Sequence, residues 1–211
     1  MNGITERRTE KYIYSLLPRR DAVLRDMERY AQKHCVPIIG PACGRLLYQL
    51  ARLIRAQRVF ELGSAIGYST LWLARAVGPH GTVFYTDSSP ANARRAEHYL
   101  RRARVLDRVR ILVGDALRLF RSTDGEFDLI FNDVSKKQYP EVFRMAVPRV
   151  RLGGLFITDN ALWSGRVARP GARADSETRA IQRFNRLIYH SPKLLTTIIP
   201  LRDGFAVCEK L

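Results

Sequence analysis

Short apolar runs recur along the chain after Arg58, and this recurrence constrains the fold more than any other feature of the sequence. Seven runs have the length and composition of β-strands, at residues 59–62, 82–86, 109–113, 127–132, 154–158, 194–200 and 205–209. The first five are separated by segments with a helical pattern, at residues 68–77, 90–103, 116–120 and 139–147. Such alternation is typical of crossover units, so the sequence predicts a parallel sheet with helices on both faces.

The two ends of the chain depart from this alternation. Arg202, Asp203 and Gly204 alone separate the last two runs, and so short a connection predicts an antiparallel hairpin at a sheet edge. Residues 19–34 and 42–56 carry apolar side chains at three-to-four spacing and are expected to form amphipathic helices. We therefore expect a single domain over residues 1–211, with a helical section at 1–57 and an α/β core at 58–211.

The composition is that of a soluble protein. No apolar run approaches the roughly 20 residues of a membrane-spanning helix, and the first residues lack the pattern of a secretory signal. Cys35, Cys43 and Cys208 are odd in number and widely spaced, which favours buried, reduced thiols over disulfides or a zinc site. We expect a cytoplasmic protein with no membrane contact.

Basic residues are in large excess, and the formal net charge is +16. Much of the excess lies in one segment, at Arg94, Arg95, Arg101, Arg102, Arg104, Arg108 and Arg110. A field of this size would attract nucleic acid, an anionic surface or acidic substrates. A solvated helix face explains the same residues, so the charge alone does not identify a partner.

The end of the first predicted strand carries two glycines, at the edge where open parallel sheets bind ligands. The segment runs from Glu61 through Gly63 and Gly67 to Ser69. The glycines allow a tight turn close to a ligand, and the helix that follows offers free N–H groups. Glu61 stands where a phosphate site would have Lys or Arg, which favours a nucleoside without phosphates.

Carboxylates follow the next two predicted strands. Asp87 lies about twenty residues beyond the glycines, where its two oxygens can accept from both hydroxyls of a ribose. Asp115, followed by Ala116, ends the third strand and can accept from the exocyclic amine of adenine. Each has a competing explanation as a cap of the next helix. Together the three strand ends predict a nucleoside site.

Strands four and five are followed by a second set of polar residues. Asp133 follows the fourth strand, and Asp159 and Asn160 follow the fifth, so these side chains are expected to converge. Three hard oxygen ligands suit Mg²⁺ first, and Mn²⁺ or Ca²⁺, better than zinc, although a simple turn also explains Asp159 and Asn160. Lys136, one turn beyond Asp133, can act as a general base beside such an ion; the alternative is an exposed lysine at a helix start.

At these residues the sequence resembles the caffeoyl-CoA and catechol O-methyltransferase family, from about residue 41 onward. The motifs are ELG (61–63) with Tyr68 and Ser69, GDA (114–116), FDLIFND (127–133) with Lys136 and Tyr139, GG (153–154), DNALWSGRV (159–167), Phe184 with Asn185, and PLRDG (200–204). Their combination and order are more specific than any one of them.

The resemblance implies a Rossmann-like, seven-stranded, mostly parallel sheet with a reversed last strand and extra N-terminal helices. It implies a class I O-methyltransferase, commonly a homodimer, that binds S-adenosylmethionine at Glu61, Gly63, Ser69, Asp87, Asp115 and Ala116. It also implies a divalent metal at Asp133, Asp159 and Asn160, with Asp133 and Lys136 as the catalytic pair and Lys136 as the base. Two positions depart from the family, which often has Glu at Asp87 and Asp at Ser135, and the second departure bears on acceptor specificity.

The sequence leaves the methyl acceptor open. The first hypothesis is a small hydroxylated molecule with two neighbouring oxygens, such as a catechol, because a chelating metal selects adjacent oxygens. The alternative is tRNA that carries 5-hydroxyuridine and binds to the Arg-rich segment. A third hypothesis, a noncatalytic nucleic-acid-binding module, follows from the rule that fold does not fix function, but the complete ligand set argues against it.

Overall fold

The computed structural model describes residues 4–169 and 175–211, and the chain divides into two compact units. The N-terminal unit is Leu16–Asp124, and the C-terminal unit combines Met1–Ser15 with Gly125–Leu211. Three helices precede the first strand, which begins at Arg58, so the predicted change from helices to alternating strands and helices is confirmed. The single domain expected from the sequence stays a prediction.

Three parallel strands form the sheet of the N-terminal unit, in the order β3-β2-β1. They are β1 (Arg58–Leu62), β2 (Thr82–Asp87) and β3 (Val109–Val113). The inner residues of β1 and β2 are buried, as expected for strands that are covered on both faces. All three predicted strands of this unit are therefore confirmed, with bounds that differ by at most a residue at each end.

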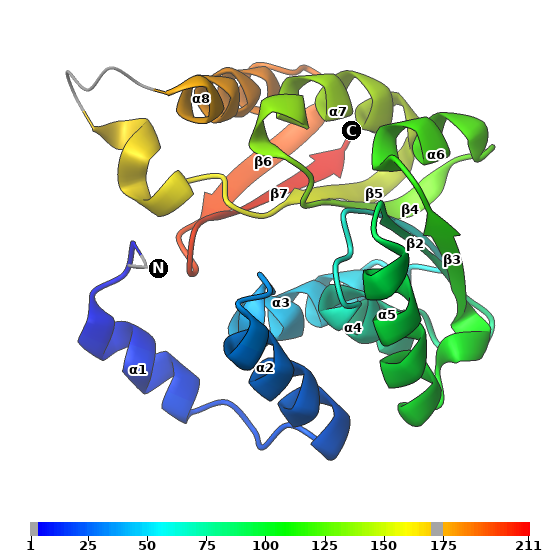
Figure 1. Cartoon of the computed structure of the whole chain (residues 1–211). Helices are drawn as coiled ribbons and strands as arrows, with labels where there is room; N and C mark the ends of the chain where they lie inside the picture. Colours follow the sequence, from blue (N-terminus) through cyan, green and yellow to red (C-terminus); the bar gives the residue numbers. More distant parts are fainter. Residues whose placement is uncertain (1–3, 170–174) are drawn as a thin grey trace. The chain divides into compact units, whose positions relative to one another are not determined.

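Helices cover both faces of this sheet. Figure 1 shows α4 (Tyr68–Val77) and α5 (Pro90–Arg102) below the strands and α6 (Ala116–Ser122) above them. The short helix η1 (Leu106–Arg108) leads into β3. Side chains of Ser89 and Asp115 cap α5 and α6 by accepting from backbone N–H groups three residues later. The predicted crossover units are present.

Two more helices of this unit, α2 (Ala22–His34) and α3 (Gly40–Leu53), precede β1. α2 begins later than predicted because Asp21 accepts hydrogen bonds from the first free N–H groups and so fixes the helix start. α3 has Pro41 in its first turn and ends before residue 56, since Arg55 adopts the left-handed conformation with φ 51°.

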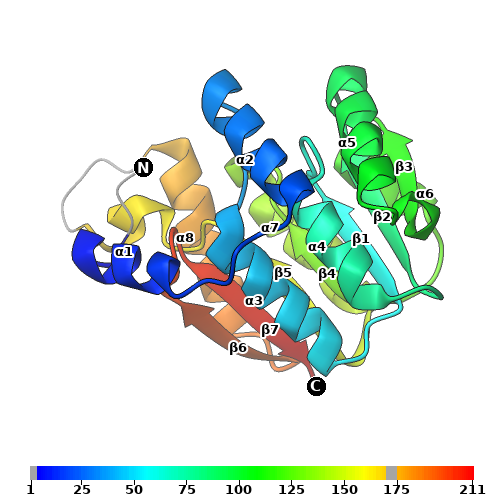
Figure 2. The ribbon, with the colours of Figure 1, turned by 90° about the horizontal axis from the view of Figure 1, so that it is seen from below.

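Four strands form the sheet of the C-terminal unit, in the order β4-β5-β7-β6. They are β4 (Phe127–Asn132), β5 (Val150–Thr158), β6 (Leu194–Ile199) and β7 (Phe205–Lys210). β4 and β5 are parallel, and β7 runs antiparallel to both β5 and β6, which confirms the predicted hairpin. Figure 2 shows β6 beyond β7 at the outer edge of these strands.

β5 is longer than predicted, because residues 150–153 belong to the strand although they lack an apolar run. A Cβ at Gly154 would lie 2.7 Å from the backbone oxygen of Asp128, so the glycine lets β5 approach β4 closely. The register between β4 and β5 shifts between Phe127 and Leu129 at the same level.

Two helices in the C-terminal unit were not predicted from the sequence. α8 (Ser176–Tyr189) lies with α7 (Tyr139–Ala146) above the strands in Figure 1, and α1 (Arg7–Ser15) has no buried residue. The remaining short helices of this unit are η2 (Lys136–Gln138), η3 (Val147–Arg149) and η4 (Trp163–Ala168). A main-chain bond from Ile4 to the oxygen of Arg202 (3.2 Å) ties the start of the described chain to the β6–β7 turn.

Aromatic side chains dominate the core of each unit. Phe60 packs against Phe84 and Phe120 in the N-terminal unit, with ring centroids 5.7 and 4.9 Å apart. Tyr139 packs edge-on against Phe184 at 5.3 Å in the C-terminal unit. The Phe60–Phe120 contact holds α6 on the sheet, and the Tyr139–Phe184 contact joins α7 to α8.

Two expectations about exposure have different outcomes. Among the described residues, no helix is long and apolar enough to cross a membrane. Cys43 and Cys208 are buried free thiols, as predicted, but Cys35 is exposed. The prediction for Cys35 was wrong because this residue ends α2 in a left-handed conformation, with φ 53°, where the chain leaves the core.

Candidate functional site

The turn between β1 and α4 depends on its two glycines. Gly63 and Gly67 have φ values of 85° and 82°, in the left-handed region that favours glycine. A Cβ at Gly67 would lie 2.9 Å from the Cβ of Ala96 in α5, so a side chain has no room there. Gly67 is also the N-cap of α4 and supplies no capping side chain, so the helix N–H groups remain accessible to a ligand.

The end of β2 fixes this turn. The Thr86 hydroxyl donates to the Glu61 main-chain oxygen (2.7 Å) and accepts from Gly63 N (3.3 Å). Asp87 Oδ2 accepts from Ala65 N at 3.0 Å, which fastens the middle of the turn to the same strand end. The predicted cofactor residues Gly63 and Asp87 are thus brought together.

Asp87 is not the helix cap that the sequence offered as an alternative, because Ser89 caps α5. Asp87 Oδ1 accepts from Ser89 N (2.8 Å) and from Asn92 Nδ2 (3.1 Å). A carboxylate has about four lone-pair positions, so three protein donors leave room for a ligand hydroxyl. The geometry is compatible with the predicted ribose contact, which stays a prediction.

Glu61 and Ser69 lie buried next to the turn, at 0% and 6% exposure. The Thr70 hydroxyl donates to Glu61 Oε2 and fixes the carboxylate. Burial of a carboxylate is costly unless donors compensate it, so an apolar core position would not retain a glutamate without a polar partner. Glu61 and Ser69 therefore have the surroundings of binding residues.

Asp115 has the geometry of a helix N-cap, which is the alternative to a cofactor contact. Its Oδ1 accepts from Arg118 N at 2.8 Å, the bond of an N-cap, and the side chain is exposed. Ala116 is the first residue of α6. The contact of Asp115 with adenine and the cofactor-binding role of Ala116 stay predictions, and the cap by itself accounts for the aspartate.

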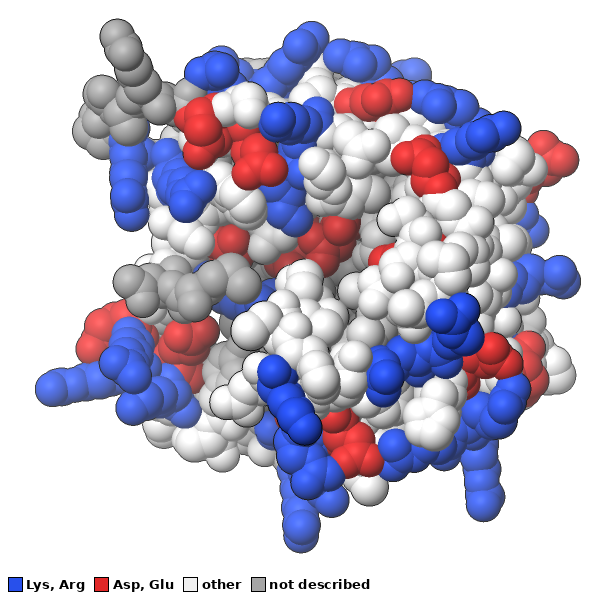
Figure 3. Space-filling view, in the orientation of Figure 1, with Lys and Arg blue, Asp and Glu red and all other residues white. Residues whose placement is uncertain are grey.

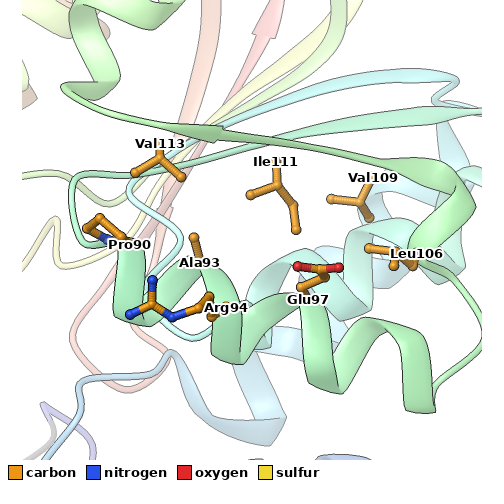
Figure 4. Close-up of a pocket in the computed structure, with 8 residues that line it drawn as sticks. All are labelled: Pro90, Ala93, Arg94, Glu97, Leu106, Val109, Ile111 and Val113. Atoms are coloured by element: carbon orange, nitrogen blue, oxygen red, sulfur yellow. The ribbon is translucent and has the colours of Figure 1, made fainter.

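A cavity of about 420 Å³ lies between α5 and β3 of the same unit. Figure 4 shows Val109, Ile111 and Val113 pointing from β3 toward the helix, which contributes Arg94 and Glu97. None of the predicted cofactor residues lines it. The cavity is an apolar groove with one charge of each sign and belongs to neither predicted site.

The register of β4 and β5 places the predicted metal ligands of the C-terminal unit. Asn132 pairs with Thr158, and Asp133 and Asp159 are the next residues of the two strands. Asp159 N donates to the Asn132 oxygen at 3.2 Å, which continues the pairing past the strand ends. The two carboxylates therefore leave neighbouring strands at the same level, as predicted.

Lys136 is not an exposed lysine, since its side chain is 13% exposed. Its Nζ donates to Asp133 Oδ1 at 2.9 Å and to the Val134 oxygen at 3.4 Å. The ammonium also lies 5.3 Å from the ring centroid of Tyr139 and 5.8 Å from that of Trp163. The predicted catalytic pair is thus in contact, and two aromatic rings attract the Lys136 side chain by cation–π interaction.

The pKa values of Asp159 and Asp133 are both raised. Burial, followed by the charge of Asp133, raises the pKa of Asp159 to about 7, and the Arg202 guanidinium 3.4 Å from Oδ2 opposes the rise. Burial also raises the pKa of Asp133, against the effect of Lys136. A buried carboxylate whose ionisation is disfavoured by a neighbouring carboxylate is typical of a site for a cation.

Asn160 has a left-handed backbone, with φ 60°, and accepts a main-chain bond from Trp163 N at 3.1 Å. The predicted alternative, a turn, is therefore present. The side chain is nevertheless buried and donates from Nδ2 to Asp203 Oδ2 at 3.1 Å. Asn160 thus combines a turn with a fixed side-chain amide.

The donor set fits a hard divalent cation. Among the described residues, Asp159 Oδ1 is buried and has no hydrogen-bond partner, and an orphaned buried acceptor calls for a donor or a cation. No three His, Cys, Asp or Glu side chains gather in the described part of the chain, because the predicted set has two carboxylates and an amide. Carboxylate and amide oxygens are ligands of Mg²⁺, Mn²⁺ and Ca²⁺ rather than of zinc.

The basic surface is partly engaged within the protein. Figure 3 shows Lys and Arg spread over much of the visible face, where they outnumber Asp and Glu. Within the Arg-rich segment, Arg95 stacks on Tyr30 at 4.0 Å and Arg102 pairs with Asp26. These contacts give part of the segment a structural explanation, and RNA binding stays a prediction.

Comparison with known proteins identifies the family of this chain. The chain matches the O-methyltransferase family over residues 17–211. The chain belongs to this family. The predicted S-adenosylmethionine-dependent O-methyltransferase is thus confirmed at the level of the family.

Individual members support the assignment. A catechol O-methyltransferase from Mycobacterium tuberculosis is 35% identical and covers 78% of this chain and 76% of its own. A catechol O-methyltransferase from Niastella koreensis is 30% identical, with 98% of each chain covered. The O-methyltransferase from Bacillus cereus in complex with SAH has a TM-score of 0.86 at 28% identity, over 97% of each chain. This likeness confirms the predicted Rossmann-like class of mostly parallel strands with an antiparallel last strand.

Two residues of the candidate site have contacts that the sequence did not predict. Arg202 and Asp203 lie in the β6–β7 turn and reach Asp159 and Asn160. Both belong to the PLRDG motif, for which the sequence alone predicts only a hairpin turn. A sequence signal for them does exist: two charged residues lie in a short turn between two apolar strands. Charged side chains close to buried strands usually have a specific partner.

Proposed function

We propose that this O-methyltransferase transfers a methyl group from S-adenosylmethionine to one of two neighbouring hydroxyls of a small molecule. A divalent cation, held by Asp133, Asp159 and Asn160, takes part, and Lys136 is the base. The observation that carries the proposal is Lys136 Nζ 2.9 Å from the half-buried Asp133, at the end of the strand next to the one that leads into the buried Asp159 and Asn160.

The turn of the N-terminal unit supports the cofactor assignment. Gly63 and Gly67 bring the backbone within reach of a ligand, and Asp87 retains acceptor positions for a ribose. The similar Bacillus cereus enzyme is in complex with SAH, the product that S-adenosylmethionine leaves after transfer. When bound, S-adenosylmethionine supplies a methyl group on a sulfonium, which accepts the electron pair of the breaking C–S bond.

Lys136 supplies the proton acceptor. Its Nζ takes the proton of the acceptor hydroxyl, and the freed oxygen forms the new bond to the methyl carbon. A bound divalent cation supplies a positive charge that lowers the pKa of a neighbouring hydroxyl. Asp133 holds the Lys136 side chain in place through its Oδ1, and the rings of Tyr139 and Trp163 lie against Lys136 Nζ at 5.3 and 5.8 Å.

A vicinal pair of oxygens on the acceptor follows from the ligand number. Three protein ligands leave open positions on a six-coordinate ion such as Mg²⁺, and two neighbouring oxygens of one molecule can occupy two of them. Two relatives, at 35% and 30% identity, are catechol O-methyltransferases, which supports a catechol-like acceptor. A homodimer and a cytoplasmic location stay predictions.

The test is transfer of labelled methyl from S-adenosylmethionine to a catechol panel, with Mg²⁺ or with EDTA. The same assay offers tRNA that carries 5-hydroxyuridine, the alternative acceptor. We expect EDTA-sensitive labelling of catechols, strongly reduced in Lys136→Met and retained in Lys137→Met, which changes the exposed neighbouring lysine.

Three outcomes would contradict the proposal. Labelling that persists with EDTA would remove the cation from the reaction. Labelling of tRNA alone would replace the small acceptor by RNA. Equal losses in Lys136→Met and Lys137→Met would show that the catalytic base has been misassigned.

A further inference from the structure

Asp203 is a buried acid in the turn between β6 and β7. Its exposure is 3%, and the hairpin brings it next to the segment that follows β5, 43 residues away in sequence from Asn160. A two-strand hairpin does not need an acidic side chain inside the protein, because carboxylates favour exposed turn positions. The burial of Asp203 therefore requires an explanation from its contacts.

The first contact fixes an amide. Asp203 Oδ2 accepts from Asn160 Nδ2 at 3.1 Å. A carboxylate only accepts, so the amide must turn its NH₂ group toward Asp203 and its Oδ1 away from it. Asn160 thereby presents an oxygen rather than a nitrogen to its remaining surroundings, as a hard cation requires.

The second contact fixes the start of η4. Asp203 Oδ1 accepts from Ser164 N, whose residue has a left-handed backbone with φ 51°. The main chain of the turn makes two more bonds to the same segment, from Leu162 N to the Asp203 oxygen (3.0 Å) and from Ala161 N to the Gly204 oxygen (2.9 Å). The turn thus holds residues 160–164 along their length.

Gly204 permits this close approach. Its φ is 86°, and an added Cβ would lie 2.6 Å from Leu162 N and from the Leu162 side chain. The two neighbouring positions of the turn are therefore specialised for contact with the same segment, one by the absence of a side chain and the other by a buried carboxylate.

We propose that Asp203 is a positioning residue, which sets the amide orientation of Asn160 so that Oδ1 serves as a metal ligand and holds the Trp163–Ala168 helix at its start. The inference rests on the proposed metal-dependent function. Asp203 acts through Asn160 and Ser164 and does not itself take part in the reaction.

The decisive variants exchange carboxylate and amide. Asp203→Asn leaves one acceptor oxygen for two donors, Ser164 N and Asn160 Nδ2. With that oxygen on Ser164 N, the new NH₂ faces the NH₂ of Asn160, so Asn160 must rotate and turn its nitrogen toward the cation. Outer contacts of this kind change metal affinity by about 10–100-fold, and we expect a loss in this range. The double variant Asn160→Asp with Asp203→Asn restores a donor–acceptor pair and leaves a carboxylate oxygen for the cation, so affinity should recover.

The measurement is titration with Mn²⁺ alone, followed by the electron paramagnetic resonance signal of the free ion. Asp128→Asn is the matched control, because it removes another partly buried carboxylate of the same unit, paired with Arg151 at the start of β4. Circular dichroism and thermal unfolding of each variant, with EDTA, report on folding separately from binding.

The outcomes are distinct. Loss of Mn²⁺ affinity in Asp203→Asn with recovery in the double variant supports the positioning role, since a merely structural role predicts no recovery. Wild-type affinity in Asp203→Asn, or a double variant as weak as the single one, overturns it. If the unchanged protein binds no Mn²⁺, the metal-dependent function fails, and the inference fails with it. If Asp203→Asn does not fold, the comparison of the double variant with the unchanged protein decides.

Discussion

Asp159→Asn is expected to remove a pH-dependent loss of stability from the metal-free protein. The Asp159 side chain is 2% exposed, and burial, followed by the charge of Asp133, raises its pKa from 3.8 to about 7. The folded protein thus holds this proton more tightly than the unfolded chain does. The resulting stability is complete below about pH 4 and is lost as the pH rises through about 7. Asparagine has no such proton, so the variant should not share the loss.

The magnitude follows from the two pKa values of Asp159, 3.8 and about 7. Each unit of difference corresponds to about 1.4 kcal/mol in the free energy of unfolding. The loss of wild-type stability between pH 5 and pH 8 covers about two pH units, from pH 5 to the folded pKa of about 7. The free energy of unfolding of the variant, relative to wild type, should therefore rise by about 3 kcal/mol over this range. For a chain of this size that is a growth in melting-temperature difference on the order of 10 °C.

The assay is thermal and urea unfolding of EDTA-treated protein at several pH values from 5 to 8. Groups that titrate equally in both proteins cancel in the difference. Asp175→Asn is the control, because hydrogen bonds from the Thr178 main chain lower the pKa of Asp175, so it stays ionised throughout this range. Its difference from wild type should be flat. A flat difference for Asp159→Asn as well would refute the reasoning.

Added Mg²⁺ tests whether the same carboxylate binds a cation once it is ionised. At pH 8 the cation should compensate the buried charge that remains after the proton is lost. A ligand at 100 times its Kd stabilises the folded state by about 2.7 kcal/mol. Wild type should gain stability in this way and Asp159→Asn should gain little. Equal gains would show that the cation binds elsewhere.

Three further predictions concern the base and the cofactor turn. Lys136→Met should lower kcat by about 10²–10⁴-fold with unchanged S-adenosylmethionine affinity in calorimetry, and an unchanged kcat would exclude Lys136 as the base. Asp87→Ala should weaken S-adenosylmethionine binding by about 10–100-fold, because a hydrogen bond to a charged group contributes about 1.5–3 kcal/mol; full affinity would exclude the ribose contact. Asp115→Ala should lower the free energy of unfolding by about 1 kcal/mol through the lost cap, and undiminished cofactor affinity would leave capping as its only role.

The strands were predictable because their apolar runs are short, regular and bounded by polar turns. α8 was not predicted, although its buried residues Ile181, Phe184 and Ile188 recur at the three-to-four spacing of an amphipathic helix, with exposed arginines between them. α1 has no buried residue at all, so no apolar stripe could reveal it.

The candidate site was predictable where it depends on strand ends. Asp133, Asp159 and Asn160 follow two strands that turn out to be parallel neighbours, and the register brings them to one level. The contacts of Arg202 and Asp203 with this group span 43 residues and depend on how far the β6–β7 hairpin extends. A hydrophobic pattern gives the existence of a hairpin but not the position of its turn against another strand.

The order of the strands along the chain also separates two kinds of ligand contact. The predicted cofactor residues follow β1, β2 and β3 and belong to the N-terminal unit, whereas the predicted metal ligands and Lys136 follow β4 and β5 in the C-terminal unit. Substitution of Asp87 thus perturbs one set of contacts and substitution of Asp159 the other. We therefore expect Asp87→Ala to lower cofactor affinity and Asp159→Asn to lower metal affinity, with both affinities measured in each variant. Loss of both affinities in one variant would show that its contact has been assigned to the wrong ligand.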